Sequence, residues 1–257
     1  MNKQVSLDAV SDFLDQYLGI HGVPDEPNAL NGLQVENSGT ISRLVAAVDA
    51  SQATIDGVAE QSSEGPPLLL VHHGLFWDGN APLTGRRIRR VRRLLVNDVA
   101  LYSAHLPLDI HPEVGNNVEL ARAIGLDVSG WFGDHLGIPI GVWGSLAVSR
   151  QTLVERIDQV LGTRSLLLPG GPEQVGRVGI ITGGAGSMIA AALDAGLDTF
   201  ITGEGAHHTY FDAMEWGINT VYAGHYATEQ LGVQALARKV AAEFNLPWSF
   251  LSYPTGL

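Results

Sequence analysis

Residues 67–74 read PLLLVHHG, an unbroken apolar run that stops at two adjacent histidines. A short apolar run of this kind predicts a buried strand. Two similar runs flank it, LVAAV at 44–48 and VALYSA at 99–104, and helical patterns at 52–60 and 84–96 separate the three. Strands that alternate with helices are typical of a parallel sheet with helices on its faces.

The same order returns in the second half of the chain. Apolar runs at 177–181, 199–202 and 220–222 predict three strands, and the patterns at 187–195 and 228–244 predict helices between and after them. An amphipathic helix is also expected at the start of the chain. It covers residues 6–19, with Ser6 as N-cap and Gly19 at its end.

The segment between the two series has a different pattern, with strand-like residues at 138–147, a helical pattern at 150–161 and a further strand at 165–168. We therefore expect an α/β protein made of two α/β halves with mainly parallel sheets and helices on the sheet faces. The expected boundaries give a first half at residues 1–135, a small inserted β/α unit at 136–172 and a second half at 173–257 that completes the functional site.

Composition excludes several classes of protein. Cysteine is absent from the 257 residues, which excludes disulfides, thiolate metal sites and cysteine nucleophiles. The net charge of −12 argues against a protein that binds the nucleic-acid backbone. The N-terminus lacks the features of a signal peptide and no apolar run is long enough to span a membrane, so we expect a cytoplasmic protein. Charged residues make up only 16%, which suggests that other subunits cover part of the surface.

Metal-binding types of side chain gather at or after the ends of the predicted strands. These are His72, His73, His105, Asp109, Glu204, His207, His208, His225 and Glu229. Ligands bind to parallel sheets at the carboxyl ends of the strands. A single histidine there is usually structural, but so many in one class of position favour a metal site. Imidazoles mixed with carboxylates favour Zn, Fe, Mn, Co or Ni over Mg or Ca.

The spacing of these residues constrains how they can be used. Neighbouring side chains on a strand point to opposite sides, so the pair His72–His73 suits two ions, one each. His225 and Glu229 are four residues apart and share a face if the segment is helical. Asp109 can supply a carboxylate that orients or bridges.

Several of these residues lie in motifs of one family. The segments are Asn31-Gly32-Leu33-Gln34-Val35, His72-His73-Gly74-Leu75-Phe76-Trp77, His105-Leu106-Pro107-Leu108-Asp109, Gly203-Glu204 and Gly224-His225-Tyr226-Ala227-Thr228-Glu229. In this order the chain resembles the short bacterial form of the Nif-three-like dinuclear metal centre proteins, often named GTP cyclohydrolase I type 2.

The resemblance implies two divalent transition-metal ions per chain, with the ligands His72, His73, Asp109, His225 and Glu229. It implies that Glu229 bridges both ions, with His72 and Asp109 on one and with His73 and His225 indicated for the other. It also implies a homohexameric ring.

Two other motifs leave alternatives open. Arg86, Arg87, Arg89, Arg90, Arg92 and Arg93 form a basic cluster. The cluster fits a solvated helix face, or else a surface that gathers phosphates or an acidic partner. The glycine-rich turn Thr182–Gly186 fits a tight strand-to-helix connection, or else a phosphate-binding loop, although it has neither P-loop nor dinucleotide spacing.

These observations give a two-metal hydrolase as the leading hypothesis. Its substrate would be a small molecule or a nucleotide, for example GTP opened at C8 of the guanine ring, and Glu204, His207 and His208 would move protons. The alternatives are a phosphoesterase that uses the same metal pair and a non-catalytic hexameric scaffold or regulator. The sequence identifies no organic cofactor and no membrane partner.

Overall fold

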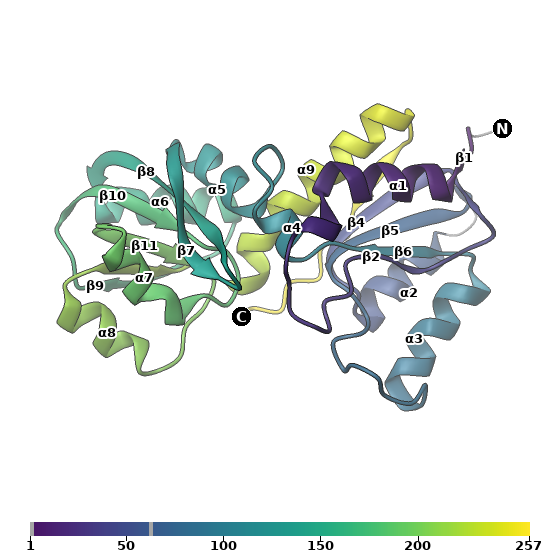
Figure 1. Cartoon of the computed structure of the whole chain (residues 1–257), viewed down its shortest axis with the longest axis horizontal. Helices are drawn as coiled ribbons and strands as arrows, with labels where there is room; N and C mark the ends of the chain where they lie inside the picture. The colour runs from purple at the N-terminus through teal and green to yellow at the C-terminus, as the bar shows by residue number, and fades with distance from the viewer. Residues whose placement is uncertain (1–2, 62–63) are drawn as a thin grey trace. The chain divides into compact units, whose positions relative to one another are not determined.

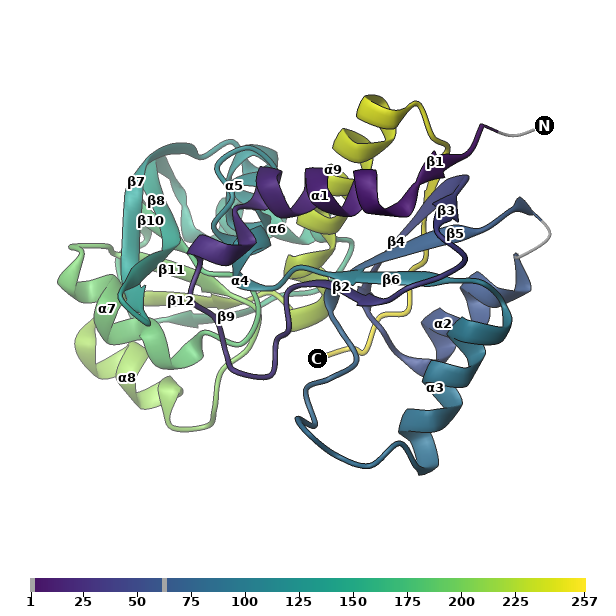
Figure 2. The same cartoon turned by 45° about the vertical axis from the view of Figure 1, so that its right-hand side comes forward.

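The computed structural model describes residues 3–61 and 64–257 and divides the chain into two compact units (Figures 1 and 2). Unit 1 contains the chain up to Leu108 together with Val233–Tyr253, and unit 2 contains Asp109–Gly232 and Pro254–Leu257. Helix α9, His225–Phe244, begins in unit 2 and ends in unit 1. Within the described ranges no helix has the length and apolar character needed to cross a bilayer.

Unit 1 is built on a five-stranded sheet in the order β13-β4-β5-β6-β2. The strands are β2 (Gly32–Val35), β4 (Arg43–Asp49), β5 (Pro67–His73), β6 (Ala100–Ser103) and β13 (Trp248–Phe250). The four from β13 to β6 are parallel and β2 is antiparallel to β6. A separate short ribbon pairs β1 (Val5–Ser6) with β3 (Thr40–Ile41). The prediction of a mainly parallel sheet is confirmed here.

Helices cover both faces of this sheet. The helical segments in this part of the chain are α1 (Leu7–Leu18), the 3-10 turn η1 (Ile20–Gly22), α2 (Gln52–Glu60), α3 (Gly85–Val96) and α4 (Leu106–Asp109). Both views place α2 and α3 on one face and α1 on the other (Figures 1 and 2). Leu69 and Leu101 belong to the core beside α2 and α3, whereas Tyr102 donates its hydroxyl to Asp15 of α1 (2.7 Å). Successive strand residues thus serve opposite faces, which gives the sheet two apolar layers.

The ends of α1 show how the sequence sets an element. The Ser6 hydroxyl accepts from the amide of Ala9 (3.4 Å), which satisfies one amide of the first turn. Gly19 takes the left-handed conformation (φ 61°) and its amide donates back to the last turn. The predicted helix at residues 6–19, with its N-cap and terminating glycine, is therefore confirmed.

The arginine cluster lies on α3, and structural contacts occupy part of it. Arg86 pairs with Asp78 (2.9 Å) and Arg93 pairs with Asp56 (3.1 Å). Arg87 donates to the carbonyl of Ala81 (2.6 Å) and lies over the Phe76 ring. For these three arginines, the contacts favour an ordinary helix face over a surface that gathers phosphates or an acidic partner.

Unit 2 is built on a six-stranded sheet in the order β7-β8-β10-β11-β12-β9. The strands are β7 (Asp127–His135), β8 (Ile138–Ser149), β9 (Leu166–Pro169), β10 (Gln174–Ile180), β11 (Thr199–Thr202) and β12 (Asn219–Tyr222). Its helices are α5 (Asn116–Ile124), α6 (Arg150–Leu161), the 3-10 turn η3 (Gly186–Met188), α7 (Ile189–Asp194) and α8 (Thr209–Trp216). The apolar cluster on one face joins residues of α5 and α6 to β8, β10, β11 and β12.

This unit differs from the sequence-based expectation in two ways. Only β10, β11 and β12 are parallel neighbours, and the other three pairings are antiparallel. Residues 136–172 form no separate inserted unit, because β8 pairs with β7 and β10, and β9 pairs with β12, inside one sheet. The division of the chain falls at Leu108/Asp109 and not at 135/136, and the return of residues 233–253 to unit 1 replaces an uninterrupted second half.

Candidate metal centre

In unit 1 the carboxyl ends of three neighbouring parallel strands bring polar side chains together. Asp49 is the last residue of β4 and lies opposite His73, the last residue of β5. His105 follows β6, the next strand in the sheet. The parallel arrangement therefore collects one carboxylate and several imidazoles at a single sheet edge, as expected for ligand sites in such sheets.

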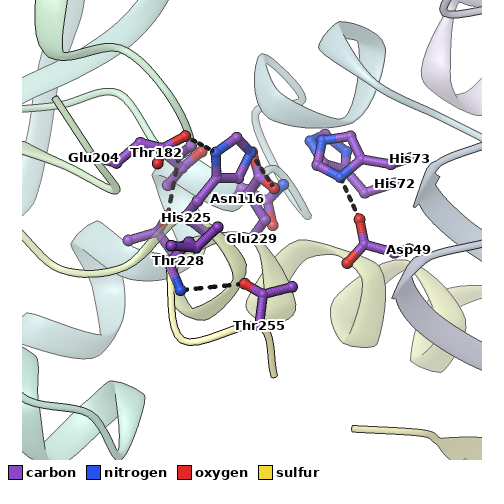
Figure 3. A network of polar contacts seen from close by, with 12 residues as sticks. Asp49, His72, His73, Asn116, Thr182, Glu204, His225, Thr228, Glu229 and Thr255 are labelled. Atoms are coloured by element: carbon purple, nitrogen blue, oxygen red, sulfur yellow. Dashed lines mark hydrogen bonds and ion pairs between the residues drawn. The ribbon is translucent and has the colours of Figure 1, made fainter. Parts of the chain in front are cut away.

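The two adjacent histidines are held through the same ring atom. Nδ1 of His72 lies 2.8 Å from the carbonyl oxygen of Ala104, and Nδ1 of His73 lies 2.9 Å from Oδ1 of Asp49 (Figure 3). A carbonyl or carboxylate oxygen can only accept, so Nδ1 carries the proton in both rings. The neutral ring then has its lone pair on Nε2, the arrangement that metal-binding histidines show.

His105 is held in the same way, by a carboxylate outside the sheet. Nδ1 of His105 lies 2.7 Å from Oδ1 of Asp25, and the His105 amide donates to the side chain of Asn31 (2.7 Å). Asp25 also accepts from Asn31 (2.8 Å) and from the amides of Glu26 (2.7 Å) and Leu106 (3.0 Å). Burial alone would raise the pKa of Asp25, but these hydrogen bonds and the charge of His105 outweigh it, and the pKa is lowered.

Two motifs noted in the sequence meet at this edge. The side chain of Gln34 accepts from the amide of Leu75 (2.8 Å) and donates to the carbonyl of Leu30 (2.9 Å). A Cβ at Gly74 would overlap the Gln34 amide group. Glycine after the two histidines therefore leaves room for the Gln34 side chain, which binds the turn that follows β5.

The three imidazoles of unit 1 lie close together. The ring centroids are 4.6 Å apart for His72 and His73, 5.1 Å for His72 and His105, and 5.7 Å for His73 and His105. One ligand atom from each ring lies within 4.8 Å of the others. The rings of these adjacent histidines thus lie side by side, although the strand pattern predicts opposite sides for neighbouring residues.

In unit 2 the parallel strands β10, β11 and β12 lead into Thr182, Glu204 and His225 respectively. Nδ1 of His225 lies 2.8 Å from Oε1 of Glu204, and its Nε2 lies 3.3 Å from Oε2 of Glu229, one turn along α9 (Figure 3). The predicted i, i+4 pair on one helix face is confirmed. Glu229 is buried, whereas the Glu204 side chain is half exposed.

These carboxylates change the acidity of His225. Its pKa is raised to about 9, chiefly by the hydrogen bond to Glu229, against the opposing effect of burial and with a further contribution from Glu204. An imidazole between two carboxylates binds a positive charge strongly. A proton supplies that charge when no metal ion is bound.

The glycine-rich turn after β10 packs against this pair. A Cβ at Gly183 would overlap Oε1 of Glu229, and Gly183 has a positive φ of 71°. Four amides of the turn donate to protein acceptors: Thr182 to Asn117, Gly183 to Thr228, Ala185 to Thr202 and Gly186 to the Glu204 carbonyl. With its amides used in this way, the turn is a tight connection that admits Glu229, and it does not resemble a phosphate-binding loop.

Asp109 is held near the same turn. Its Oδ1 accepts from Nδ2 of Asn116 (2.8 Å) and from the hydroxyl of Thr182 (3.4 Å), and it is buried. Asn117 donates to the Asp109 carbonyl (3.1 Å), which fixes the backbone at this position. The sequence indicated neither Asn116 nor Asn117, since a buried amide at the start of a helix carries no periodic signal.

The predicted proton carriers have different surroundings. Glu204 contacts His225 directly, as described above. His207 and His208 are exposed just before α8, where the His207 ring lies edge-on to Phe211 (5.7 Å). Of the three, Glu204 is the residue for which the structure shows a hydrogen bond to a predicted metal ligand, His225.

The donor chemistry of each unit fits a transition-metal ion. Unit 1 offers imidazoles whose Nδ1 atoms are bound by a carbonyl or a carboxylate, and unit 2 offers His225, Glu229 and Asp109. Such partners fix the ring orientation and raise the basicity of the other nitrogen, which is how proteins prepare histidines for Zn or Fe. The sequence missed the two supporting aspartates, Asp25 and Asp49. Asp49 could have been found as the last residue of the strand beside β5.

A family model described as Duf34/NIF3 (NGG1p interacting factor 3) matches residues 5–255. The chain belongs to the Duf34/NIF3 family. The match covers nearly all of both units.

Relatives and solved structures agree with this membership. The chain is 44% identical over 256 residues to a protein of Deinococcus radiodurans named GTP cyclohydrolase 1 type 2 homolog, covering 99% of this chain and 95% of the relative. It is similar to TTHA1606 from Thermus thermophilus (39% identity, TM-score 0.88, covering 98% and 100%). It is also similar to protein ybgI, described as of unknown function (36% identity, TM-score 0.90, covering 98% and 100%). The resemblance to the family predicted from sequence is confirmed.

Proposed function

We propose that this NIF3-family chain is a hydrolase that depends on a dinuclear metal centre. The proposed ligands are His72, His73, Asp109, His225 and Glu229, with Glu229 as the bridge between two ions. When bound, two divalent transition-metal ions supply Lewis acidity and make water a stronger nucleophile near neutral pH.

The main support for the proposal is a hydrogen-bonding pattern that three of the proposed histidine ligands share. His72, His73 and His225 all have Nδ1 hydrogen-bonded to an oxygen acceptor, so each ring has a fixed orientation about its strand end. Structural histidines need no common pattern of this kind, whereas metal-binding histidines almost always have it. Five ligands for two ions leave coordination positions for a substrate, which favours catalysis over a purely structural metal site.

The chain's own residues have distinct roles in this proposal. Asp49, Glu204 and the Ala104 carbonyl orient the imidazoles. Glu204 is also half exposed and contacts His225, so it can hold or pass a proton at the edge of the site. His207 and His208 are proposed as further proton carriers, since both are exposed just before α8.

The proposed substrate is a small molecule or a nucleotide, and GTP is the first candidate because the Deinococcus relative is named a cyclohydrolase homolog. In such a reaction water adds at C8 of guanine, the imidazole ring opens to a formamide, and a second water hydrolyses the formamide to release formate. The test measures formate release from GTP, and hydrolysis of p-nitrophenyl phosphate and bis(p-nitrophenyl) phosphate, with Zn²⁺, Mn²⁺, Fe²⁺ or Co²⁺ added to chelator-treated protein.

The expected result is turnover of one of these substrates that requires the metal and is lost in Glu229→Ala. Glu243→Ala, an exposed glutamate on the same helix, is the matched control and should keep it. Turnover that survives metal removal would contradict the proposal. Two bound ions without turnover on any of these substrates would favour the non-catalytic scaffold.

A second experiment separates proton transfer from metal holding. Glu204→Gln and His208→Ala should keep both metals and lose roughly 10²–10⁴-fold in turnover if these groups move protons. Wild-type turnover in Glu204→Gln, His207→Ala and His208→Ala, each with both metals bound, would show that none of them does so.

We also propose that the chain assembles as a homohexamer. Helix α8 supports this with a cluster of exposed apolar side chains, whose exposed fractions are Tyr210 47%, Phe211 49%, Met214 37% and Trp216 50%. An exposed apolar patch commonly marks a protein contact. Light scattering should give a hexamer for the native chain and smaller species for Phe211→Asp. A monomer at micromolar concentrations of the native chain would refute the assembly.

A further inference from the structure

Helix α3, at the periphery of unit 1 in both views, has an exposed face with two arginines that no acidic side chain neutralises (Figures 1 and 2). Within residues 3–61 and 64–257, neither Arg89 nor Arg92 has an ion pair or a side-chain hydrogen bond, in contrast to the three arginines described above. We infer that this face of α3 binds an acidic segment of a partner protein. The inference is independent of the proposed metal centre and of the proposed hydrolysis.

The arginines of α3 repel one another. Four of them are three or four residues apart and are therefore neighbours on the helix surface: Arg86, Arg89, Arg90 and Arg93. Like charges at these spacings destabilise a helix. Burial lowers the pKa of Arg90, and the neighbouring charges of Arg86 and Arg89 lower it further. The ion pairs of Arg86 and Arg93 offset part of this repulsion, and an anionic partner would offset the rest.

The first turn of α3 adds to this imbalance. It contains two arginines and no acidic residue, and the Thr84 side chain does not cap it. The positive end of the helix dipole disfavours cations at this place. Local rules that are broken without a gain inside the chain are expected at functional surfaces.

The exposed face of α3 combines charge with apolar surface. Residues of a helix turn by about 100° each, so Arg89, Arg92 and Val96 point the same way, and Leu95 lies one turn after Arg92. Leu95 is 59% exposed and Val96 is 70% exposed, while Leu94 on the opposite side is buried. Two unpaired cations and two large apolar side chains thus share one surface.

The apolar side chains favour a protein segment over a phosphate-rich ligand. A polyphosphate or a nucleic-acid backbone would pair with the arginines but would leave Leu95 and Val96 in water. Protein interfaces are enriched in arginine, and their centres are apolar. Opposite charges across an interface raise the association rate and the specificity. The partner segment is therefore acidic, with apolar side chains that cover Leu95 and Val96.

The size of the face limits the strength of this contact. From Arg89 to Val96 it is about 10 Å long, which matches two or three turns of a partner helix. So small a surface is typical of transient complexes. Its charges are exposed to solvent, so binding should weaken as the salt concentration rises.

The test uses a fluorescein-labelled peptide of about three helical turns, with glutamates along one face and leucines beside them. Fluorescence anisotropy at about 50 mM salt should give a dissociation constant in the micromolar range. Arg89→Glu/Arg92→Glu should weaken binding at least about tenfold, because attraction becomes repulsion. Leu95→Ser/Val96→Ser should weaken it by about threefold to tenfold, because less apolar surface is buried.

The matched control is Arg164→Glu, at an exposed arginine of unit 2 that also has no ion pair among the described residues. It should leave peptide binding unchanged, and Arg89→Lys/Arg92→Lys should keep most of it. Thermal unfolding should show that Arg89→Glu/Arg92→Glu is folded, since a glutamate four residues before Arg93 is a favourable spacing.

Three results would overturn the inference. The first is no binding of the peptide by the native chain. The second is equally tight binding of a leucine-free peptide of the same charge, or tighter binding of a single-stranded DNA oligonucleotide, which would mean a general anion surface. The third is a smaller assembly of Arg89→Glu/Arg92→Glu in light scattering, which would assign this face to contacts between copies of the chain.

Discussion

The two units gather metal-binding types of side chain at strand ends in the same way, but they use different residue types. Each places polar side chains at the carboxyl ends of three parallel strands. Unit 1 supplies imidazoles whose partners are a backbone carbonyl and two aspartates, and the Asp25 side chain is only 7% exposed. Unit 2 supplies carboxylates around one imidazole, and its outer partner, Glu204, is 48% exposed. The supporting carboxylates of unit 1 are thus the buried Asp25 and the partly exposed Asp49, whereas unit 2 has buried acidic donors, Glu229 and Asp109, and an exposed support, Glu204.

The largest effect on metal content is expected when a carboxylate of unit 2 is removed. Glu229→Ala should lower the metal content from about two ions per chain to about one or less, because a bridging carboxylate holds both. Metal analysis by mass spectrometry on protein purified without chelator or nickel affinity measures this, with Glu243→Ala as the control. Two ions per chain in Glu229→Ala would mean that unit 2 does not supply the bridge.

A smaller effect is expected when the turn that admits Glu229 is altered. Gly183→Ala places a methyl group on Oε1 of Glu229 and should both destabilise the chain and reduce its metal content. Gly196→Ala is a matched control, since Gly196 has nearly the same φ (70° against 71°) with no atom within 4 Å of the added carbon. Backbone strain, about 1–2 kcal/mol, is common to both variants.

Thermal unfolding and metal content distinguish the two contributions. Gly183→Ala should unfold at a lower temperature than Gly196→Ala and should be the one of the pair that loses metal. Equal behaviour of the two variants would leave strain alone as the reason for glycine at Gly183.

The smallest effect compares the supporting carboxylates in metal-free protein. Asp25→Asn should lower the free energy of unfolding by about 1–3 kcal/mol, because its amide group faces donors that lose their acceptor. Glu204→Gln, at an exposed position, should change it by less than about 0.5 kcal/mol. Denaturant unfolding of both variants measures the difference, and equal losses would contradict the contrast between a buried and an exposed support.

The Asp25 effect should also depend on pH. Because its pKa is lowered in the folded chain, Asp25 stabilises the fold above its unfolded pKa of about 3.9 and loses this contribution as the pH falls through the lowered folded value. The difference in the free energy of unfolding between native protein and Asp25→Asn should therefore be largest at about pH 6–7 and should shrink as the pH falls into the acid range. A gap that stays constant down to about pH 2 would show that the charge of Asp25 contributes nothing.

Local patterns predicted much of the fold. The apolar run before His72 became β5, and the helical pattern at 52–60 became α2 with the same limits. The division into units could not be predicted, because it depends on β13, a three-residue strand near the C-terminus that pairs with β4. Pairing between segments about two hundred residues apart leaves no periodic signal.

The candidate site also contains residues that the sequence predicts and residues that it does not. His72, His73, His225 and Glu229 follow from strand ends and helical spacing. Asp25 lies in a segment without periodicity, between η1 and β2, and its role depends on a hydrogen bond to a residue 80 positions later. The proximity of the two adjacent rings, whose centroids are 4.6 Å apart, depends on side-chain conformations that a pattern of apolar residues does not encode.

The two aspartates behind the unit 1 imidazoles have a consequence for charge balance. Asp25 and Asp49 accept hydrogen bonds from Nδ1 of His105 and His73, so a carboxylate lies behind two of the three rings. Carboxylates in these positions favour a positive charge on the opposite side of each ring. The unit 1 edge therefore favours cationic groups over anionic ones.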